Sequence, residues 1–269
     1  MDIISLIGNN RNYNFHSHTQ FCDGRAQMEE FVREAVAMGF THYGFSPHSP
    51  IPIPSPCNMS LDDVPAYLAE VSRLKALYGD RIALFTSMEI DYLGDEWGPA
   101  NPYFDTLPLD YRIGSVHFIP SDDGYIDVDG RFESFKVKME QHFHRDIRYV
   151  VETFYRQSIQ MLQAGHFDII GHFDKIGHNA GHYSPGIEDL PWYQTLVNDL
   201  IDLIIDRKVI VELNTKAWTD HHRMFPGVRY LSRLLQARVP IIVNSDAHYP
   251  KLIDASRPHA FTLLSSASQ

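Results

Sequence analysis

The sequence predicts an α/β fold in which parallel strands close into one barrel. Seven short apolar segments alternate with amphipathic segments along the 269 residues, a pattern typical of parallel strands joined by helices. The chain is 44% hydrophobic, and a single α/β barrel, typically ~250 residues, would use its whole length. Neither an internal repeat nor a linker divides the sequence. We therefore expect one domain over residues 1–269.

The expected strands are runs of apolar, often β-branched residues that end at a polar or ionisable residue. Such short runs, bounded by turn residues, favour buried strands. We place them at residues 12–15, 40–46, 82–88, 113–116, 167–171, 209–213 and 240–244.

The expected helices lie between these strands, at residues 27–38, 61–78, a long segment that ends near residue 165, 190–206 and 228–237. In the first of them, Met28, Phe31 and Ala35 fall on one helical face, and Gly39 follows the segment. Segments 49–60, rich in Pro, and 121–130, rich in Asp and Gly, are expected to be loops.

Composition excludes several classes of protein. The formal net charge of -11 argues against binding of nucleic acid, which usually requires a basic surface. No run approaches the ~20 apolar residues that cross a bilayer, and the first residues lack the basic region of a signal peptide, so we expect no membrane partner. Only Cys22 and Cys57 are present, which predicts a reducing, cytoplasmic compartment.

Two histidines one residue apart, His16 and His18, end the first expected strand. On a strand, side chains i and i+2 lie on the same face, so both rings can reach one metal ion. An isolated pair of this kind is more often a surface feature. The placement of the other histidines, among 15 in the chain, therefore decides between the two interpretations.

Further ionisable residues fall at the ends of the other expected strands. In a parallel barrel these ends converge on one mouth, where active sites form. Imidazole and carboxylate together suit Zn, Fe and Mn, and so many ligands imply two or three divalent ions. Asp23, in an Asp-Gly turn after the first strand, is a further candidate. The full set of candidate metal ligands is His16, His18, Asp23, His48, Glu89, His117, His172, Asp246 and His248.

These ligands lie within a series of short motifs. The motifs are His16-Ser17-His18-Thr19, Phe21-Cys22-Asp23-Gly24, Ser46-Pro47-His48-Ser49-Pro50, Met88-Glu89-Ile90-Asp91, Gly114-Ser115-Val116-His117-Phe118, Gly171-His172-Phe173-Asp174, Glu212-Leu213-Asn214-Thr215 and Asn244-Ser245-Asp246-Ala247-His248. Their order resembles that of the PHP (polymerase and histidinol phosphatase) superfamily. Within it, the chain is most similar to the PHP-type histidinol-phosphatases, over nearly its whole length.

The resemblance implies a distorted (β/α)7 TIM-like barrel, formed by a single domain, with a trinuclear metal centre at its C-terminal mouth. One ion would be held by His16, His18, Glu89 and Asp246. Glu89 would bridge to a second ion held by His117 and His172, and the third would be held by Asp23, His48 and His248. The sequence departs from many relatives before His48, where Ser46-Pro47 stand in place of Thr-Asp.

The resemblance also implies hydrolysis of L-histidinol phosphate to L-histidinol and phosphate, a step of histidine biosynthesis, by a hydroxide that bridges two ions. Asp246 or His248 is the expected proton donor, a role that conflicts with full metal ligation. Lys175 and Lys216 are expected to bind the phosphate group. Further candidates are Arg223, Arg229 and Arg257 for phosphate, and Asp91, Asp174 and Asp220 for an amino group of the substrate.

Two alternatives remain open at this point. One is a PHP phosphoesterase for another small phosphate ester or a nucleotide. The other is a PHP module with a structural or regulatory role, against which the retention of every expected ligand argues.

Overall fold

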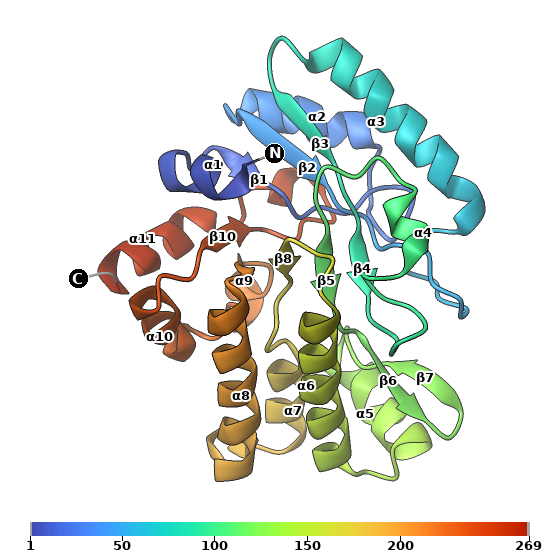
Figure 1. Cartoon of the computed structure of the whole chain (residues 1–269), viewed down its shortest axis with the longest axis vertical. Coiled ribbons are helices and arrows are strands. Elements are labelled where there is room, and N and C mark those ends of the chain that lie inside the picture. Colours follow the sequence, from blue (N-terminus) through green and yellow to red (C-terminus); the bar gives the residue numbers. More distant parts are fainter. Residues whose placement is uncertain (1, 268–269) are drawn as a thin grey trace.

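Two parallel sheets, joined edge to edge, form the barrel of this computed structural model, which describes residues 2–267 (Figure 1). The smaller sheet has the order β1 (Tyr13–Asn14), β2 (His42–Phe45), β3 (Ala83–Thr86). The larger has the order β10 (Ile241–Asn244), β9 (Ile210–Asn214), β8 (Ile169–Ile170), β5 (Ile113–Ser115), β4 (Glu89–Asp91). Every neighbouring pair within these two sheets is parallel.

The barrel closes at two irregular joints between the sheets. At one joint, β3 and β4 are halves of a single bent strand, and the backbone N–H of Glu89 donates to the carbonyl of Pro47 at 3.0 Å. At the other, Ser17 pairs with Ala247, and the N–H of His18 donates to the carbonyl of Ala247 at 2.9 Å. Since β3 and β4 share one position, the strands occupy seven positions. This confirms the predicted distorted (β/α)7 barrel.

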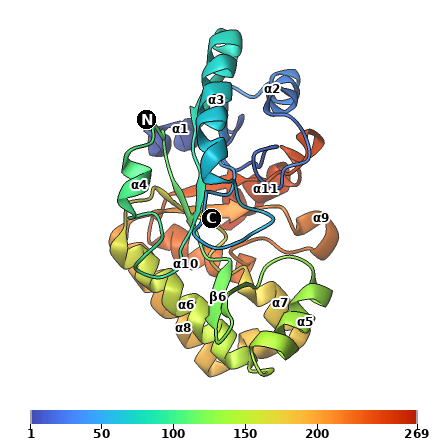
Figure 2. The same ribbon diagram turned by 90° about the vertical axis from the view of Figure 1, so that its right-hand side faces the viewer.

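Helices surround the strands, and the two perpendicular views place α3 at one end of the long axis and α5 and α7 near the other (Figures 1 and 2). None of the helices within residues 2–267 combines the length and apolar character that a membrane crossing requires. The helices are α1 (Ile3–Asn9), α2 (Met28–Ala37), α3 (Val64–Tyr78), α4 (Pro102–Asp105), α5 (Phe132–His142), α6 (Ile147–Ala164), α7 (Ile176–Tyr183), α8 (Pro191–Arg207), α9 (Trp218–His221), α10 (Leu231–Gln236) and α11 (Arg257–Ala267). Short 3-10 helices are η1 (Leu61–Asp63), η2 (Ile187–Asp189), η3 (Val228–Tyr230) and η4 (Pro250–Leu252).

Three sequence-based expectations were wrong in this outer layer. The segment 121–130, expected to be a loop, belongs largely to an antiparallel hairpin of β6 (Phe118–Ser121) and β7 (Gly124–Asp127), because Asp-Gly also suits hairpin turns. The long helix expected before residue 165 is two helices, separated where His144 and Arg145 adopt positive φ angles of 49° and 64°. Helices α1, α4, α7, α9 and α11 were not predicted.

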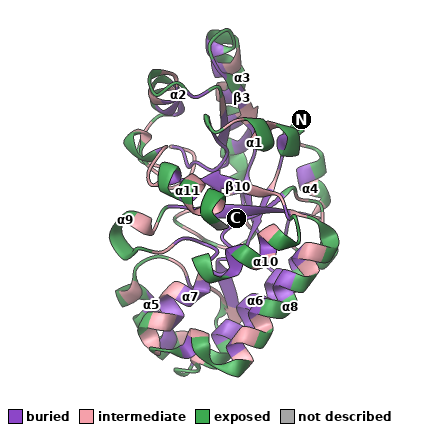
Figure 3. Cartoon of the chain, turned by 90° about the vertical axis from the view of Figure 1, so that its left-hand side faces the viewer, coloured by how far each residue is buried: buried purple, intermediate pink, exposed green. Residues whose placement is uncertain are grey.

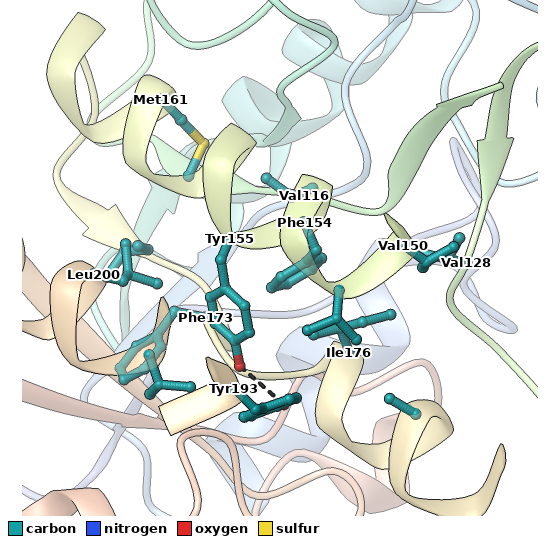
Figure 4. Packing of buried hydrophobic residues seen from close by; sticks show 14 of the residues in the cluster. Val116, Val128, Val150, Phe154, Tyr155, Met161, Phe173, Ile176, Tyr193 and Leu200 are labelled. Atoms are coloured by element: carbon teal, nitrogen blue, oxygen red, sulfur yellow. Dashed lines mark hydrogen bonds between the residues drawn. The ribbon is translucent and has the colours of Figure 1, made fainter. Parts of the chain in front are cut away.

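The largest buried cluster lies where α6 and α8 cover the strands of the larger sheet (Figure 4). On α6, buried residues such as Val150, Phe154 and Met161 recur every three to four positions and so form one apolar face. The hydroxyls of Tyr155 on α6 and Tyr193 on α8 lie 3.0 Å apart, which satisfies both polar groups inside this cluster. Figure 3 shows buried residues along the strands and exposed residues on the outer faces of the helices.

The buried side chain of Arg257 connects segments near the two ends of the chain. Its side chain is 1% exposed, and its guanidinium lies 5.2 Å from the ring centre of Tyr13 and 5.1 Å from that of Phe40. It donates to the carbonyls of Val243 on β10, at 3.2 Å, and of Arg11 ahead of β1, at 3.1 Å. One side chain from α11 therefore connects the first and the last strand.

We expect Arg257→Ala to lower the free energy of unfolding by about 3 kcal/mol, because it leaves two carbonyls and Asp254 without their partner. Urea denaturation measures the change. As a control, Arg229→Ala removes an arginine that is 48% exposed and pairs with Asp189 at the surface, and it should cost less than about 1 kcal/mol. Equal losses in the two variants would contradict the closing role of Arg257.

Candidate metal centre

The structure brings all nine predicted metal ligands together at the C-terminal mouth of the barrel. Each lies at or just after the end of a strand, as the parallel topology requires. Their positions are His16, His18 and Asp23 after β1, His48 after β2, Glu89 in β4, His117 after β5, His172 after β8, and Asp246 and His248 after β10.

Glu89 occupies the centre of this group and is 1% exposed. Its Oε2 lies 3.2 Å from His16 Nε2, 3.2 Å from His48 Nδ1 and 3.6 Å from His18 Nε2. Three imidazoles from two strand ends, those of β1 and β2, therefore face one carboxylate oxygen. The ligand atoms of His16, His18 and Glu89 lie within 4.8 Å of one another, close enough to share an ion.

The other oxygen of Glu89 faces the opposite side of the mouth. Oε1 lies 2.8 Å from His172 Nε2 and 3.5 Å from His117 Nε2, and these two nitrogens are 3.3 Å apart. The hydroxyl of Ser115 donates to the same oxygen at 2.7 Å. Glu89 thus stands between two groups of imidazoles, the position that a bridging ligand needs.

A further group combines Asp23, His48 and His248 with His18. Their ligand atoms lie within 4.8 Å of one another. Asp23 Oδ1 is 3.4 Å from His18 Nδ1, and Asp23 Oδ2 is 3.2 Å from His248 Nε2. His18 therefore lies between this group and the group around Glu89 Oε2.

Asp246 connects the ligands to the two predicted phosphate-binding lysines. Its Oδ1 lies 3.0 Å from His18 Nε2 and 3.2 Å from Lys216 Nζ, and its Oδ2 lies 4.0 Å from Lys175 Nζ. Lys216 Nζ is also 3.4 Å from His248 Nε2. The structure thus places both lysines at the edge of the ligand group.

Three buried ligand atoms have no hydrogen-bond partner within the described part of the chain: His16 Nε2, Asp23 Oδ1 and His48 Nδ1. Buried polar atoms in proteins are nearly always paired, so unpaired ones require an explanation. All three belong to predicted ligands in the same mouth. Coordination of divalent ions would satisfy them, and the donor set therefore fits a metal centre.

The charges in the mouth suit ligation directly at Glu89 and His18. Burial raises the pKa of the Glu89 carboxyl, but the rings of His16 and His117 outweigh this effect and hold the pKa well below its usual range. Burial, together with the neighbouring His248 and His48 rings, holds the pKa of His18 well below its usual value.

Burial lowers the pKa of His16, but Glu212 and Glu89 raise it well above its usual value. Burial also lowers the pKa of His117, but Asp91 and Glu89 raise it to about 9. A metal ion would therefore displace a proton from each of these two rings on binding.

Glu212, which stands in one of the sequence motifs without a predicted role, supports the candidate ligand His16. It is fully buried on β9, where its carboxylate accepts from His16 Nδ1 at 2.6 Å and from the backbone N–H of His172 at 3.1 Å. By fixing the Nδ1 proton, it turns Nε2 of His16 toward Glu89. The sequence offered one signal for this role: Glu212 is a lone carboxylate inside an apolar strand, two residues before Asn214 and on the same face of the strand.

Asp91 plays the same part for His117, whose Nδ1 lies 2.6 Å from its carboxylate. This corrects the suggestion that Asp91 could hold an amino group of the substrate, since the carboxylate is buried and also accepts from Asn58 at 2.8 Å. Glu89 and Asp91 are i and i+2 on β4. Because their side chains lie on the same face of the strand, the sequence could have indicated that Asp91 lies beside the candidate ligands.

A cavity of about 460 Å³ opens over the ligands. Lys175 and Lys216 line it as predicted, and Lys175 is anchored at 2.7 Å by Asp129, a residue that the sequence did not point to. The hairpin β6–β7 contributes Phe118 and Tyr125 to the wall. A small molecule with a phosphate group fits these dimensions and charges.

The alternative charged candidates lie elsewhere. Arg223 makes a two-pronged pair with Glu188 at 2.7 and 2.8 Å, Arg229 pairs with Asp189 at the surface, and Arg257 lies beneath the barrel. Asp174 is buried and accepts from the N–H of Gly227 at 2.8 Å, and Asp220 lines a neighbouring depression. None of these five residues lines the main cavity.

The fold and the site together define a class: parallel barrels that gather imidazoles and carboxylates at the strand ends to hold metal ions. Residues 14–216 match the PHP domain family, and the chain belongs to that family. Among curated relatives, the histidinol-phosphatase of Bacillus subtilis is 25% identical over 257 residues, which cover 87% of this chain and 92% of that protein.

Two solved structures show the same fold. A Listeria monocytogenes protein, solved under the provisional name histidinol phosphatase, has a TM-score of 0.79 at 19% identity and covers 92% of this chain and 99% of its own. The histidinol phosphate phosphatase of Lactococcus lactis, complexed with zinc, L-histidinol and phosphate, has a TM-score of 0.72 at 21% identity and covers 95% of this chain and 93% of its own.

We expect Glu212→Gln to weaken metal binding about 10- to 100-fold while the protein stays folded, because the uncharged side chain orients the His16 ring less firmly. Competition with a chelator measures the affinity, and thermal unfolding checks the fold. Glu152→Gln, on the exposed side of α6, is the matched control and should bind metal like the wild type. Equal loss of metal to the chelator from the wild type, Glu212→Gln and Glu152→Gln would contradict the role of Glu212.

Proposed function

We propose that the chain is a metal-dependent phosphomonoesterase that hydrolyses L-histidinol phosphate to L-histidinol and phosphate in histidine biosynthesis. The observation that carries the proposal is the convergence of nine ligands around Glu89 beneath a cavity that two lysines line. The names of the curated relatives and the molecules bound in the Lactococcus structure support the choice of substrate. The two free thiols fit a reducing, cytoplasmic compartment.

Two to three divalent ions, Zn, Fe or Mn, would be held by the nine residues, with Glu89 as the shared ligand. When bound in such a site, these ions lower the pKa of a coordinated water and stabilise negative charge on phosphoryl oxygens. Glu212 and Asp91 keep the rings of His16 and His117 in the orientation that ligation needs.

Lys175 and Lys216 would bind the phosphate group of the substrate. Burial lowers the pKa of Lys175, but the carboxylates of Asp129 and Asp246 more than offset this effect and raise it, so the side chain stays charged. Ammonium groups on two sides of Asp246 offer charge-assisted hydrogen bonds to phosphoryl oxygens. The phosphate would therefore lie between the lysines and the ligands.

Neither of the two expected proton donors, Asp246 and His248, holds a proton readily. Burial raises the pKa of Asp246, but Lys216 and His16 outweigh it and hold the pKa well below its usual range, so Asp246 keeps no proton to give. His248 lies at the edge of the cavity with Nε2 3.4 Å from Lys216 Nζ. Burial and the neighbouring Lys216 lower the pKa of His248, so this ring also lacks a proton to give, and both residues fit metal ligation better than proton transfer.

The purified protein should retain two or three ions per chain and hydrolyse histidinol phosphate faster than p-nitrophenyl phosphate. His117→Ala should abolish this activity without unfolding the barrel, because it removes a ligand on one side of Glu89. Metal analysis, phosphate release and circular dichroism provide the measurements. The control His144→Asn changes a side chain that is 83% exposed and should behave as wild type.

Fewer than two ions per chain, or equal rates on both esters, would contradict this function. Faster hydrolysis of a nucleotide or another small phosphate ester would favour the alternative substrate. Activity in His117→Ala would remove that residue from the ligand set.

We expect Lys216→Ala to lower kcat/KM for histidinol phosphate about 10- to 100-fold, mainly through KM, since it removes a charged hydrogen bond to phosphate. Lys216→Arg should recover part of the loss. Steady-state kinetics tests both, and Lys136→Ala, an exposed lysine on α5, is the control. A wild-type KM in Lys216→Ala would place phosphate recognition elsewhere.

A further inference from the structure

Three histidines that take no part in the proposed reaction lie close together beside the main cavity. His178 and His182 are on α7, and His221 ends α9. Their ring centres are 4.6 Å apart for His178 and His182, 4.5 Å for His178 and His221, and 6.3 Å for His182 and His221. All three line a second depression, which shares Lys175 and Lys216 with the main cavity.

The spacing of these rings fits a metal site. His178 and His182 are four residues apart, so they lie on one helical face, as in helical zinc-binding pairs. With nitrogen ligands at ~2.0–2.1 Å, the rings around a tetrahedral ion have centres roughly 5 Å apart. The three separations, from 4.5 to 6.3 Å, bracket this value.

A hydrogen bond already fixes one ligand in the required form. Nδ1 of His182 lies 2.8 Å from the backbone carbonyl of His178, and a carbonyl can only accept, so Nδ1 carries the proton. In the neutral ring, Nε2 is then free to bind a cation. A backbone carbonyl that accepts from the second nitrogen is the usual support of a metal-binding histidine.

The surroundings of His178 favour a neutral ring. Burial lowers the pKa of His178 to about 4, with further contributions from His221 and His182, so its ring is unprotonated near neutral pH. Asp220 lines the same depression and offers a carboxylate. Among the described residues, the sets whose ligand atoms already converge within 4.8 Å all lie in the main mouth. The trio would converge by rotation of the exposed His221 ring, while His182 keeps its hydrogen bond to the carbonyl of His178.

We propose that His178, His182 and His221 form a separate, peripheral site for one transition-metal ion such as Zn²⁺. The site is open to solvent, whereas the ligands around Glu89 are buried. Its ion would therefore exchange more readily than those of the main mouth. The ion would also lie in the second depression, which shares Lys175 and Lys216 with the main cavity.

Zinc stoichiometry tests this site in the metal-loaded protein. After dialysis against buffered micromolar Zn²⁺, wild type should hold one ion more per chain than His182→Asn or His221→Asn. The exposed control His144→Asn, whose φ of 49° suits asparagine, should match wild type. Because both trio variants change exposed side chains, they should fold normally, and circular dichroism checks this.

Equal zinc content in wild type and both variants would overturn the site, as would an equal loss in the His144→Asn control. The count does not depend on catalysis. Phosphatase activity at low free zinc should be unchanged in the two variants, so a failure of the proposed function leaves this result interpretable.

Discussion

The buried carboxylate of Glu89 is the constraint on which the rest of the structure depends. A charge removed from water is costly unless groups of opposite polarity surround it. Here five imidazoles approach its two oxygens within 3.6 Å, and they come from the ends of four other strand positions. Only a closed parallel barrel delivers so many strand ends to one point. The bend between β3 and β4 places Glu89 at that point.

A second layer of carboxylates fixes the register of the strands. Glu212 on β9 and Asp91 on β4 each lie 2.6 Å from Nδ1 of a candidate ligand, His16 and His117 respectively. Because side chains alternate along a strand, a slip of one residue would turn Glu212 away from His16 and leave its charge buried without a partner. The polar mouth therefore adds to the apolar core in specifying the strand pairing.

The sequence predicted which residues meet at the mouth because each is a local event: an apolar strand followed by an imidazole or a carboxylate. Glu212 escaped this reasoning since its partner His16 is 196 residues away, and no local pattern reports such a pair. The hairpin β6–β7 and helix α7 escaped it for another reason. Their sequences are rich in Gly, Asp and His, which have weak propensities, and contacts with the rest of the fold decide their structure.

These poorly predicted segments are also the ones that shape the binding surface. Tyr125 of the hairpin and Asp129 after it line the main cavity, and α7 brings His178 and His182 to the adjoining depression. The barrel strands supply the residues that hold charge, whereas these connections supply the residues that can contact the remainder of a phosphate ester. Substrate choice should therefore depend mainly on the segments after β5 and β8, where the backbone can change without moving Glu89 or its ring of imidazoles.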